Sequence, residues 1–276
     1  DANHQFDPSA GPEFPKKVAR ALVRWTQAPA SCGKGVRIGM IDSNLDLKHP
    51  ALKGQDIVFK SFHGKGRKPG PKDHGTAVAS IMVGTAEWGG LLPGAKLFAA
   101  NMFEVNKKGR KVGNLSGLLK SVSWLFQEKV HIINLSFAGA DNKVMRKVFQ
   151  SVQKNKMIMV ASVGNWGRSD TPAFPAAYKG VIGVTGIDDR GLPYAKANTG
   201  KFVDFAASPG GGGRLQTGTS FATPFITAMM GLDIARGKAK TSSALTSLLK
   251  KTVKDLGAPG HDKTFGWGFA RQKPSC

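Results

Sequence analysis

VRIGMID, residues 36–42, is a continuous apolar run that only Arg37 interrupts before the run ends on Asp42. Similar runs of strand length follow along the chain, and they are IVFKSF (57–62), KLFAANMF (96–103), HIINLSF (131–137), MIMVASVG (157–164) and VIGVTGID (181–188). Strands that are apolar throughout, rather than at every second residue, are typical of a parallel sheet buried on both faces. The sequence therefore predicts one buried, mostly parallel sheet.

The segments between these runs have the length and pattern of helices. They are HGTAVASIMVG (74–84), LSGLLKSVSWLFQE (115–128) and NKVMRKVFQSVQKN (142–155). Two further helices are predicted over 219–235 and 241–256, the second capped by Thr241 or Ser242. Strands that alternate with helices predict right-handed crossovers. We therefore expect a three-layer α/β/α fold around the central sheet.

We expect a single domain over residues 14–276, because no internal repeat or linker interrupts the pattern. Residues 1–13 are polar and rich in Pro and Gly, and they predict an extended arm. Residues 14–25 (FPKKVARALVRW) follow with an apolar stripe at helical spacing and a basic opposite face. Packing of the stripe on the domain is the favoured interpretation, and binding to a membrane surface is the alternative.

Composition excludes several classes of protein. The chain has 276 residues, of which 41% are hydrophobic and 21% charged, as in ordinary globular proteins rather than disordered ones. No apolar run approaches the ~20 residues that cross a bilayer. The 40 Lys and Arg against 18 Asp and Glu give a net charge of +22, which attracts acidic or anionic surfaces in general. Charge alone does not predict specific recognition of nucleic acid, and we expect none. We also expect the protein to be a monomer.

The two cysteines, Cys32 and Cys276, fit no zinc-ligand spacing. A disulfide that ties down the last residue is the favoured interpretation, and two unpaired thiols are the alternative. A disulfide, together with a start at Asp1 that lacks a leader, predicts a processed and secreted protein, extracellular or periplasmic.

Three short segments each place a reactive side chain where a parallel sheet exposes it. Asp42 ends an apolar strand, His74 opens a helical run of small residues, and Ser220 follows a Gly-Thr turn at the start of a helix. Alone, each has a structural explanation as a cap, a hydrogen-bonding histidine or a turn. Together with Asn165, in a Gly-flanked turn after a strand, they form the set of groups that nucleophilic acyl transfer needs.

The sequence resembles the subtilisin-like serine proteases, or subtilases, over residues 18–271. The matching strings are VRIGMIDSNLDLKHPAL (36–52), HGTAVAS (74–80), IINLSFAG (132–139), VASVGNWG (160–167), GTSFATP (218–224) and FGWGFARQ (265–272). The resemblance implies that Ser220 is the nucleophile, that His74 is its base, and that Asp42 orients the imidazole. It also implies that Asn165 and the backbone amide of Ser220 stabilise the oxyanion.

By the same resemblance, an extended substrate peptide adds as a strand between residues 109–114 and 135–139. The expected contact residues are Lys111, Val112, Gly113, Ser136, Phe137, Ala138 and Gly139. Ser162, Val163 and Gly164 are expected to line the pocket for the side chain before the cleaved bond, with Ala173 near its floor. Because Ser162–Gly164 and Ala173 carry no charge, we expect a small or apolar side chain there.

The sequence also departs from the family pattern. TAEWGGLLPGA (85–95) is shorter than the family's common calcium-binding loop, and Ala51 replaces an acidic residue often found there. We therefore expect no required cofactor and no strong metal site there, and weak calcium binding elsewhere is the alternative.

These residues predict a serine endopeptidase that cleaves extracellular polypeptides through an acyl-enzyme on Ser220. One alternative is a processing protease of narrow specificity, and a remote one is an inactive polyanion-binding protein. The basic loops 63–72 and 106–111 are interpreted as solvated surface, or alternatively as sites that attract acidic polypeptides.

Overall fold

The computed structural model of the chain describes residues 28–188, 190–208, 218–274 and 276. The expected arm at 1–13 and the expected helix at 14–25 lie outside the described residues. The domain boundary at residue 14 thus stays a prediction.

Seven strands form one sheet in the order β10-β9-β8-β7-β1-β4-β2. They are β1 (Arg37–Asp42), β2 (Ile57–Ser61), β4 (Lys96–Asn101), β7 (Ile132–Leu135), β8 (Ile158–Ser162), β9 (Val181–Gly186) and β10 (Phe205–Ala207). Every pair of neighbouring strands is parallel. β1 lies near the centre, with Ile38 opposite Leu97 of β4 and opposite Ile132 of β7. The predicted parallel sheet is confirmed.

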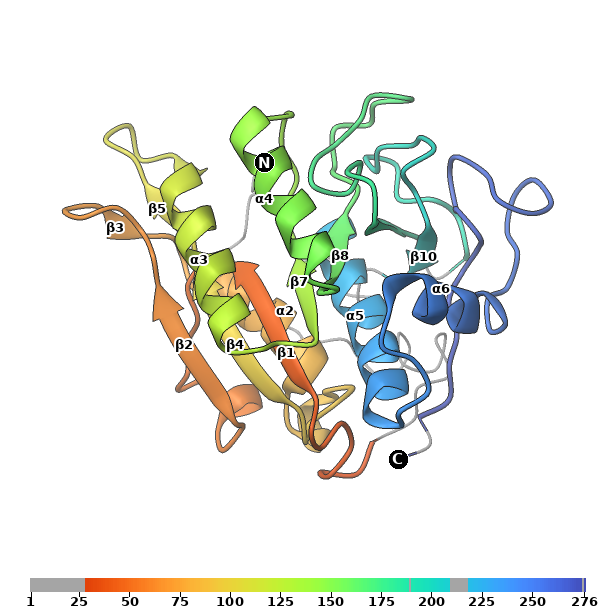
Figure 1. Cartoon of the computed structure of the whole chain (residues 1–276), viewed down its shortest axis with the longest axis horizontal. Helices are drawn as coiled ribbons and strands as arrows, with labels where there is room; N and C mark the ends of the chain where they lie inside the picture. Colours follow the sequence, from red (N-terminus) through yellow and green to blue (C-terminus); the bar gives the residue numbers. More distant parts are fainter. Residues whose placement is uncertain (1–27, 189, 209–217, 275) are drawn as a thin grey trace.

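Helices cover both faces of this sheet (Figure 1). α2 (Asp73–Val83), α5 (Thr219–Ala235) and α6 (Ser242–Lys250) pack on one face in a core that includes Met40. α3 (Leu115–Gln127) and α4 (Lys143–Lys154) lie side by side on the other face, in a core that includes Ile41. Adjacent residues of β1 thus belong to opposite cores, which explains why the strand is apolar throughout. The three-layer α/β/α fold is confirmed.

A second, smaller sheet was not predicted. It consists of β3 (Lys68–Pro69), β5 (Phe103–Val105) and β6 (Lys111–Gly113), paired antiparallel in the order β3-β5-β6. The run 96–103, predicted as one strand, is therefore divided between β4 and β5. These strands have only two or three residues each, and β3 pairs with a strand far from it in sequence, so the hydrophobic pattern does not reveal them.

The last predicted helix ends earlier than expected. Thr241 caps α6 through its side chain, as one of the two predicted candidates. The helix stops at Lys250 rather than near residue 256, because Lys254 instead exchanges two backbone hydrogen bonds of 2.8 Å with Phe269. Two 3-10 turns, η1 (Pro50–Leu52) and η2 (Ala86–Trp88), complete the described elements.

A disulfide joins Cys32 and Cys276, whose Cα atoms lie 5.2 Å apart across a sequence separation of 244 residues. The structure therefore has the pairing that the sequence favoured rather than two thiols. Within the described ranges, all helices are too short or too polar to cross a bilayer.

Candidate active site

The carboxyl ends of β1 and β2 point to the upper edge of the sheet in Figure 1. At this edge, Asp42 is the last residue of β1 and His74 is the second residue of α2. His74 Nδ1 lies 2.7 Å from Asp42 Oδ1, and Asp42 is 1% exposed whereas His74 is 17% exposed. Because a carboxylate only accepts, Nδ1–H donates to Asp42 and Nε2 of the neutral ring keeps its lone pair. The pair thus supplies an oriented base.

Asp42 is itself held by the turn that follows β1. The backbone N–H of Ser43 donates to Asp42 Oδ1 at 2.6 Å. Ser43 Oγ in turn accepts from the N–H of Gly75, the residue after His74, at 3.0 Å. A Cβ at Gly75 would lie 2.6 Å from the carbonyl oxygen of Asn44, so only glycine fits this approach. These contacts fix α2 against the end of β1.

Ser220 is the second residue of α5 and is 6% exposed. Its neighbour Phe221 packs against the imidazole of His74, with ring centroids 5.1 Å apart. The start of α5 therefore lies beside the Asp42–His74 pair. A hydroxyl in the first turn of a helix lies at the positive end of the helix dipole, where developing negative charge is favoured.

The carbonyl of Ser220 has a partner from the neighbouring strand. Pro224, four residues later in α5, has no N–H with which to close the usual helical bond to this carbonyl. Ser136 Oγ donates to it instead at 2.7 Å. Asn134 Nδ2 donates to Ser136 Oγ, and Thr227 Oγ1 donates to Asn134 Oδ1, at 2.8 and 2.9 Å. Ser136, predicted as a substrate contact, thus also anchors the first turn of α5.

Asn165 lies against the same turn of α5. Its Oδ1 accepts from both the backbone N–H and the hydroxyl of Thr219, each at 3.0 Å. With the oxygen of the amide committed to Thr219, the donor end of the side chain is its Nδ2 group. Asn165 thus places an amide donor next to the residue that precedes Ser220.

The two expected substrate segments lie in different sheets. Lys111, Val112 and Gly113 form β6, which is an edge strand of the small sheet, paired only with β5 among the described residues. Ser136–Gly139 directly follow β7, and Gly139 exchanges backbone hydrogen bonds of 2.8 and 3.0 Å with Phe174. An extended peptide can be added to a sheet beside such an edge strand.

A cavity of about 260 Å³ lies between these two segments, and the sequence did not predict it. Apolar side chains from several elements line it, including Met102, Phe103, Leu118, Phe137, Met145 and Phe174. The rings of Phe103 and Phe137 meet edge to face at 6.1 Å. Only Phe137 of these six was predicted, because the others come from distant segments that carry no motif. We call this the apolar cleft cavity.

The expected pocket segment follows β8 and is buried. Ser162 is 1% exposed and Val163 is not exposed, and a Cβ at Gly164 would lie 3.3 Å from the Cβ of Ala138. Ala173 is also fully buried and directly precedes Phe174, the partner of Gly139. The three segments therefore lie together, and no charged side chain is among them.

Comparisons with known proteins identify a family and several related proteases. The sequence profile of the Subtilase family matches residues 33–268. The Minor extracellular protease Epr of Bacillus subtilis is 29% identical over 258 residues, which cover 87% of this chain but only 38% of Epr. The Major intracellular serine protease of the same organism is 26% identical over 263 residues, covering 86% of this chain and 81% of that protein.

Among solved structures, the psychrophilic subtilisin-like protease Apa1 from Pseudoalteromonas sp. AS-11 has a TM-score of 0.76 at 14% identity, and the likeness covers 92% of this chain and 95% of that one. This likeness concerns the fold. The fold and the sequence relatives together define a serine peptidase. The chain belongs to the Subtilase family, as its motifs predicted.

Proposed function

We propose that this chain is an endopeptidase that cleaves peptide bonds through an acyl-enzyme on Ser220. The observation that carries the proposal is the 2.7 Å hydrogen bond between His74 and Asp42, on a ring that packs against Phe221. His74 Nε2 takes the proton of Ser220 Oγ as the oxygen attacks the scissile carbonyl carbon, and then gives it to the leaving amine. A water molecule then attacks the acyl-enzyme while His74 takes its proton. His74 returns this proton to Ser220 Oγ as the acid product leaves, which restores Ser220.

Negative charge that develops on the carbonyl oxygen is met by two N–H donors. One is Nδ2 of Asn165, whose Oδ1 is held by Thr219 at 3.0 Å. The other is the backbone amide of Ser220, in the first turn of α5. Donors that are already in place before the reaction need no reorganisation in the transition state, which is why they lower its free energy.

The substrates of a peptidase are polypeptides, and the proposal adds how they bind. An extended peptide pairs with β6 and with residues 136–139, and the side chain before the cleaved bond faces Ser162–Gly164. A second, apolar side chain further toward the amino end of the peptide enters the apolar cleft cavity. The support is that both segments flank this cavity and that no charge lines it. Cleavage profiles on peptide libraries distinguish a broad enzyme from the narrow processing protease.

We further propose that the substrates are extracellular and acidic. The disulfide between Cys32 and Cys276 supports secretion, because such bonds persist in oxidising compartments. The two basic loops belong to the small sheet beside the cleft, where β6 and its turn carry Lys107, Lys108, Arg110 and Lys111. Cations along an edge that binds peptide favour acidic side chains there. No cofactor takes part in the proposed reaction, and calcium independence stays a prediction.

The decisive experiment is labelling with a fluorophosphonate, which phosphonylates an activated serine. We expect the native chain and a Ser247→Ala control to be labelled, whereas Ser220→Ala is not. Ser247 is an exposed serine of α6, so the control removes a hydroxyl far from the cleft. Melting temperatures of the three proteins check that each is folded. Equal labelling of Ser220→Ala, or none of the native chain, would show that Ser220 is not the nucleophile.

A further inference from the structure

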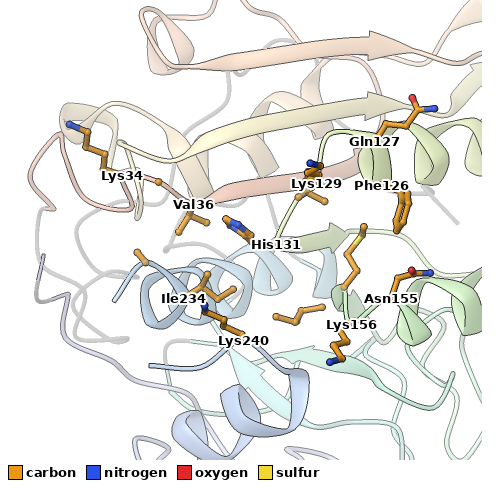
Figure 2. Close-up of a pocket in the computed structure, with 15 residues that line it drawn as sticks. Lys34, Val36, Phe126, Gln127, Lys129, His131, Asn155, Lys156, Ile234 and Lys240 are labelled. Atoms are coloured by element: carbon orange, nitrogen blue, oxygen red, sulfur yellow. The ribbon is translucent and has the colours of Figure 1, made fainter. Parts of the chain in front are cut away.

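A second cavity opens at the amino ends of the parallel strands, on the edge of the sheet opposite the active site. Val36, His131 and Met157, which directly precede β1, β7 and β8, line it. Figure 2 shows the cavity with His131 at its centre. Its volume is about 680 Å³, within the range of sites for drug-sized ligands. We call it the amino-edge cavity.

The amino-edge cavity is distant from the active site. Ile234 and Ala235, at the last turn of α5, contribute to its wall, whereas Ser220 lies in the first turn of the same helix. A helix of 17 residues is about 25 Å long at 1.5 Å per residue. A ligand in this cavity therefore does not touch Ser220 or His74.

The floor of the cavity is apolar and its rim is basic. Val36, Val130 and Met157 are buried beneath it, and the side chain of Phe126 is 48% exposed at its wall. Lys34, Lys129, Lys156 and Lys240 are among the residues that line it (Figure 2), and all four are exposed. No carboxylate is among the described residues that line the cavity.

In the part of the chain that the structure describes, none of these four lysines has an ion-pair partner. The nearest acidic residue along the chain, Glu128, is engaged with Arg37 at 3.4 Å and does not line the cavity. Four cations without counterions around an apolar floor favour a ligand that carries negative charge.

Two of the lysines occupy backbone positions that a lysine rarely adopts. Lys129 and Lys156 follow the carboxyl ends of α3 and α4 with φ of 50° and 60°. Apart from them, the only described non-glycine residue with positive φ is Asp170. Glycine or asparagine is the usual residue at such a helix end, because a side chain is strained there.

Interaction with helix dipoles does not explain the positions of all four lysines. Lys129 and Lys156 interact favourably with the negative ends of the helix dipoles, as a cation does at any helix carboxyl end. Lys240 does not, because it directly precedes Thr241, the N-cap of α6, where a positive charge is unfavourable. Lys34 precedes β1 and is on no helix.

His131 adds a hydrogen-bond donor at the centre of the cavity. Its Nδ1 accepts from the backbone N–H of Arg37 at 3.2 Å, so Nε2 carries the proton of the neutral ring. Partial burial lowers the pKa of His131, and the charges of Arg37 and Lys240 lower it further. A bound anion can therefore receive a neutral N–H donor from the ring beside the cation of Lys240.

We propose that the amino-edge cavity binds an amphiphilic anion, a small molecule that carries one carboxylate or phosphate group on an apolar chain or ring. The head group lies at His131 and Lys240, and Lys156 neutralises it from the opposite side of the rim. The apolar body covers Phe126, Val130 and Met157. A concave site of this size fits such a molecule better than it fits an extended polypeptide, which needs a longer groove.

The test is calorimetric titration of decanoate into the Ser220→Ala chain, in which self-cleavage is prevented if the proposed function is right. Binding does not depend on peptidase activity, so failure here and failure of the proposed function are distinguishable. We expect saturable one-to-one binding. Replacing both Lys156→Gln and Lys240→Gln should raise the Kd at least tenfold, and 1-decanol, which lacks the charge, should bind at least tenfold more weakly than decanoate.

The matched control is the pair Lys143→Gln and Lys147→Gln, which removes the same charge from the exposed surface of α4 near its other end. It should change the Kd less than twofold. Equal weakening by both pairs would assign the effect to net charge and overturn the proposal, as would absence of saturation or equal binding of 1-decanol. Sedimentation with phosphatidylglycerol vesicles that needs Lys156 and Lys240, without decanoate binding, would assign these lysines to a membrane surface and likewise overturn it.

Discussion

A proline determines how the turn that carries Ser220 is held. Pro224 leaves the carbonyl of Ser220 without its helical N–H, and Ser136 fills that role at 2.7 Å from the end of β7. The helix that carries Ser220 is thereby bonded to the sheet through a buried chain that continues to Asn134 and Thr227. A buried network in which every member is paired holds one geometry and resists displacement.

Replacement of Asn165 should affect the transition state of the reaction and not the binding of substrate. Replacing Asn165→Ala removes a donor that the proposed mechanism uses only as negative charge develops, so kcat should fall while KM changes little. Removal of one such oxyanion donor typically lowers kcat by about 10²–10³, and we expect the same order here. Steady-state kinetics on one peptide substrate give both constants.

The control for this variant is Asn155→Ala, since Asn155 is an exposed residue after α4. It should leave kcat within about twofold, as surface substitutions commonly do. A fall in kcat/KM that came entirely from KM would contradict the assigned role, because it would indicate ground-state binding instead.

Asp204 is a mostly buried carboxyl group outside the active site. Burial raises its pKa from the ordinary 3.8 to about 6, although the N–H of Gly183, which donates at 2.7 Å, and the charges of His261 and Lys250 act the other way. The folded state thus holds this proton more tightly than the unfolded chain does. Its contribution to stability is complete below pH 3.8 and is lost as the pH rises to about 6.

Replacing Asp204→Asn should therefore stabilise the fold above pH 6 and not at pH 4. The amide still accepts from Gly183 but has no charge to bury, and the gain in free energy of unfolding should be on the order of 2 kcal/mol at pH 8. Denaturant unfolding at both pH values measures it. The matched control is Asp56→Asn, which alters a 62% exposed carboxylate. If the difference between Asp204→Asn and the native chain were the same at both pH values, the buried charge would not be its cause.

The sequence alone singles out the four candidate catalytic residues because each lies in a short contiguous string. Asp42, His74, Asn165 and Ser220 stand at strand or helix ends that hydrophobic pattern alone locates. The apolar cleft cavity escaped prediction for the opposite reason. Its side chains, such as Met102, Met145 and Phe174, read as ordinary core residues until the fold brings their segments together.

Among the elements, β6 is linked to a distant loop through one buried side chain of β5. Glu104 of β5 is 8% exposed and accepts from the N–H of Gly64 at 2.7 Å and from Asn114 Nδ2 at 3.1 Å. Asn114 follows β6 and caps α3. One carboxylate thus joins the basic loop 63–67 to the edge strand that is expected to bind substrate. Hydrogen bonds between residues far apart in sequence leave no mark in the hydrophobic pattern. For this reason the small sheet was not predicted, whereas the long apolar strands were.

The charge on this sheet leads to a prediction about salt. Cleavage of an acidic peptide should slow as ionic strength rises, because salt screens attraction between exposed charges beyond about 8–10 Å. A neutral peptide of the same length should respond little. Replacing both Lys108→Gln and Arg110→Gln, at the turn before β6, should bring kcat/KM for the acidic peptide several-fold closer to the neutral value.

The pair Lys154→Gln and Lys156→Gln serves as the control, because it lowers net charge equally at the carboxyl end of α4, on the edge of the sheet opposite the cleft. An equal effect of the two pairs would attribute substrate preference to the +22 charge of the whole chain rather than to the small sheet. Identical salt responses of the acidic and neutral peptides would remove the basis for acidic substrates altogether.

At the scale of the molecule, the candidate active site and the amino-edge cavity lie at opposite edges of one sheet. β1 connects them, with Val36 at the amino-edge cavity and Asp42 at the active site. Parallel topology produces this arrangement, since all strands begin at one edge and end at the other. The sequence motifs lie at the carboxyl edge, whereas lysines scattered between positions 34 and 240 give no sign of a common site in the sequence.

The disulfide should stabilise the whole molecule. Replacing both Cys32→Ser and Cys276→Ser removes a link across 244 residues, and loss of a native disulfide commonly lowers the free energy of unfolding by about 2–5 kcal/mol. Thermal unfolding in the Ser220→Ala background measures this without self-cleavage. The native cysteines treated with reductant should melt with the variant, and equal melting of the oxidised chain and the variant would show that the link is not stabilising.

The same link closes residues 32–276 of the polypeptide into a covalent ring. Hydrolysis of any one bond between these two positions opens the ring without releasing a fragment. A molecule nicked once by a neighbour would therefore keep its full mass on a gel run without reductant and separate into pieces only after reduction.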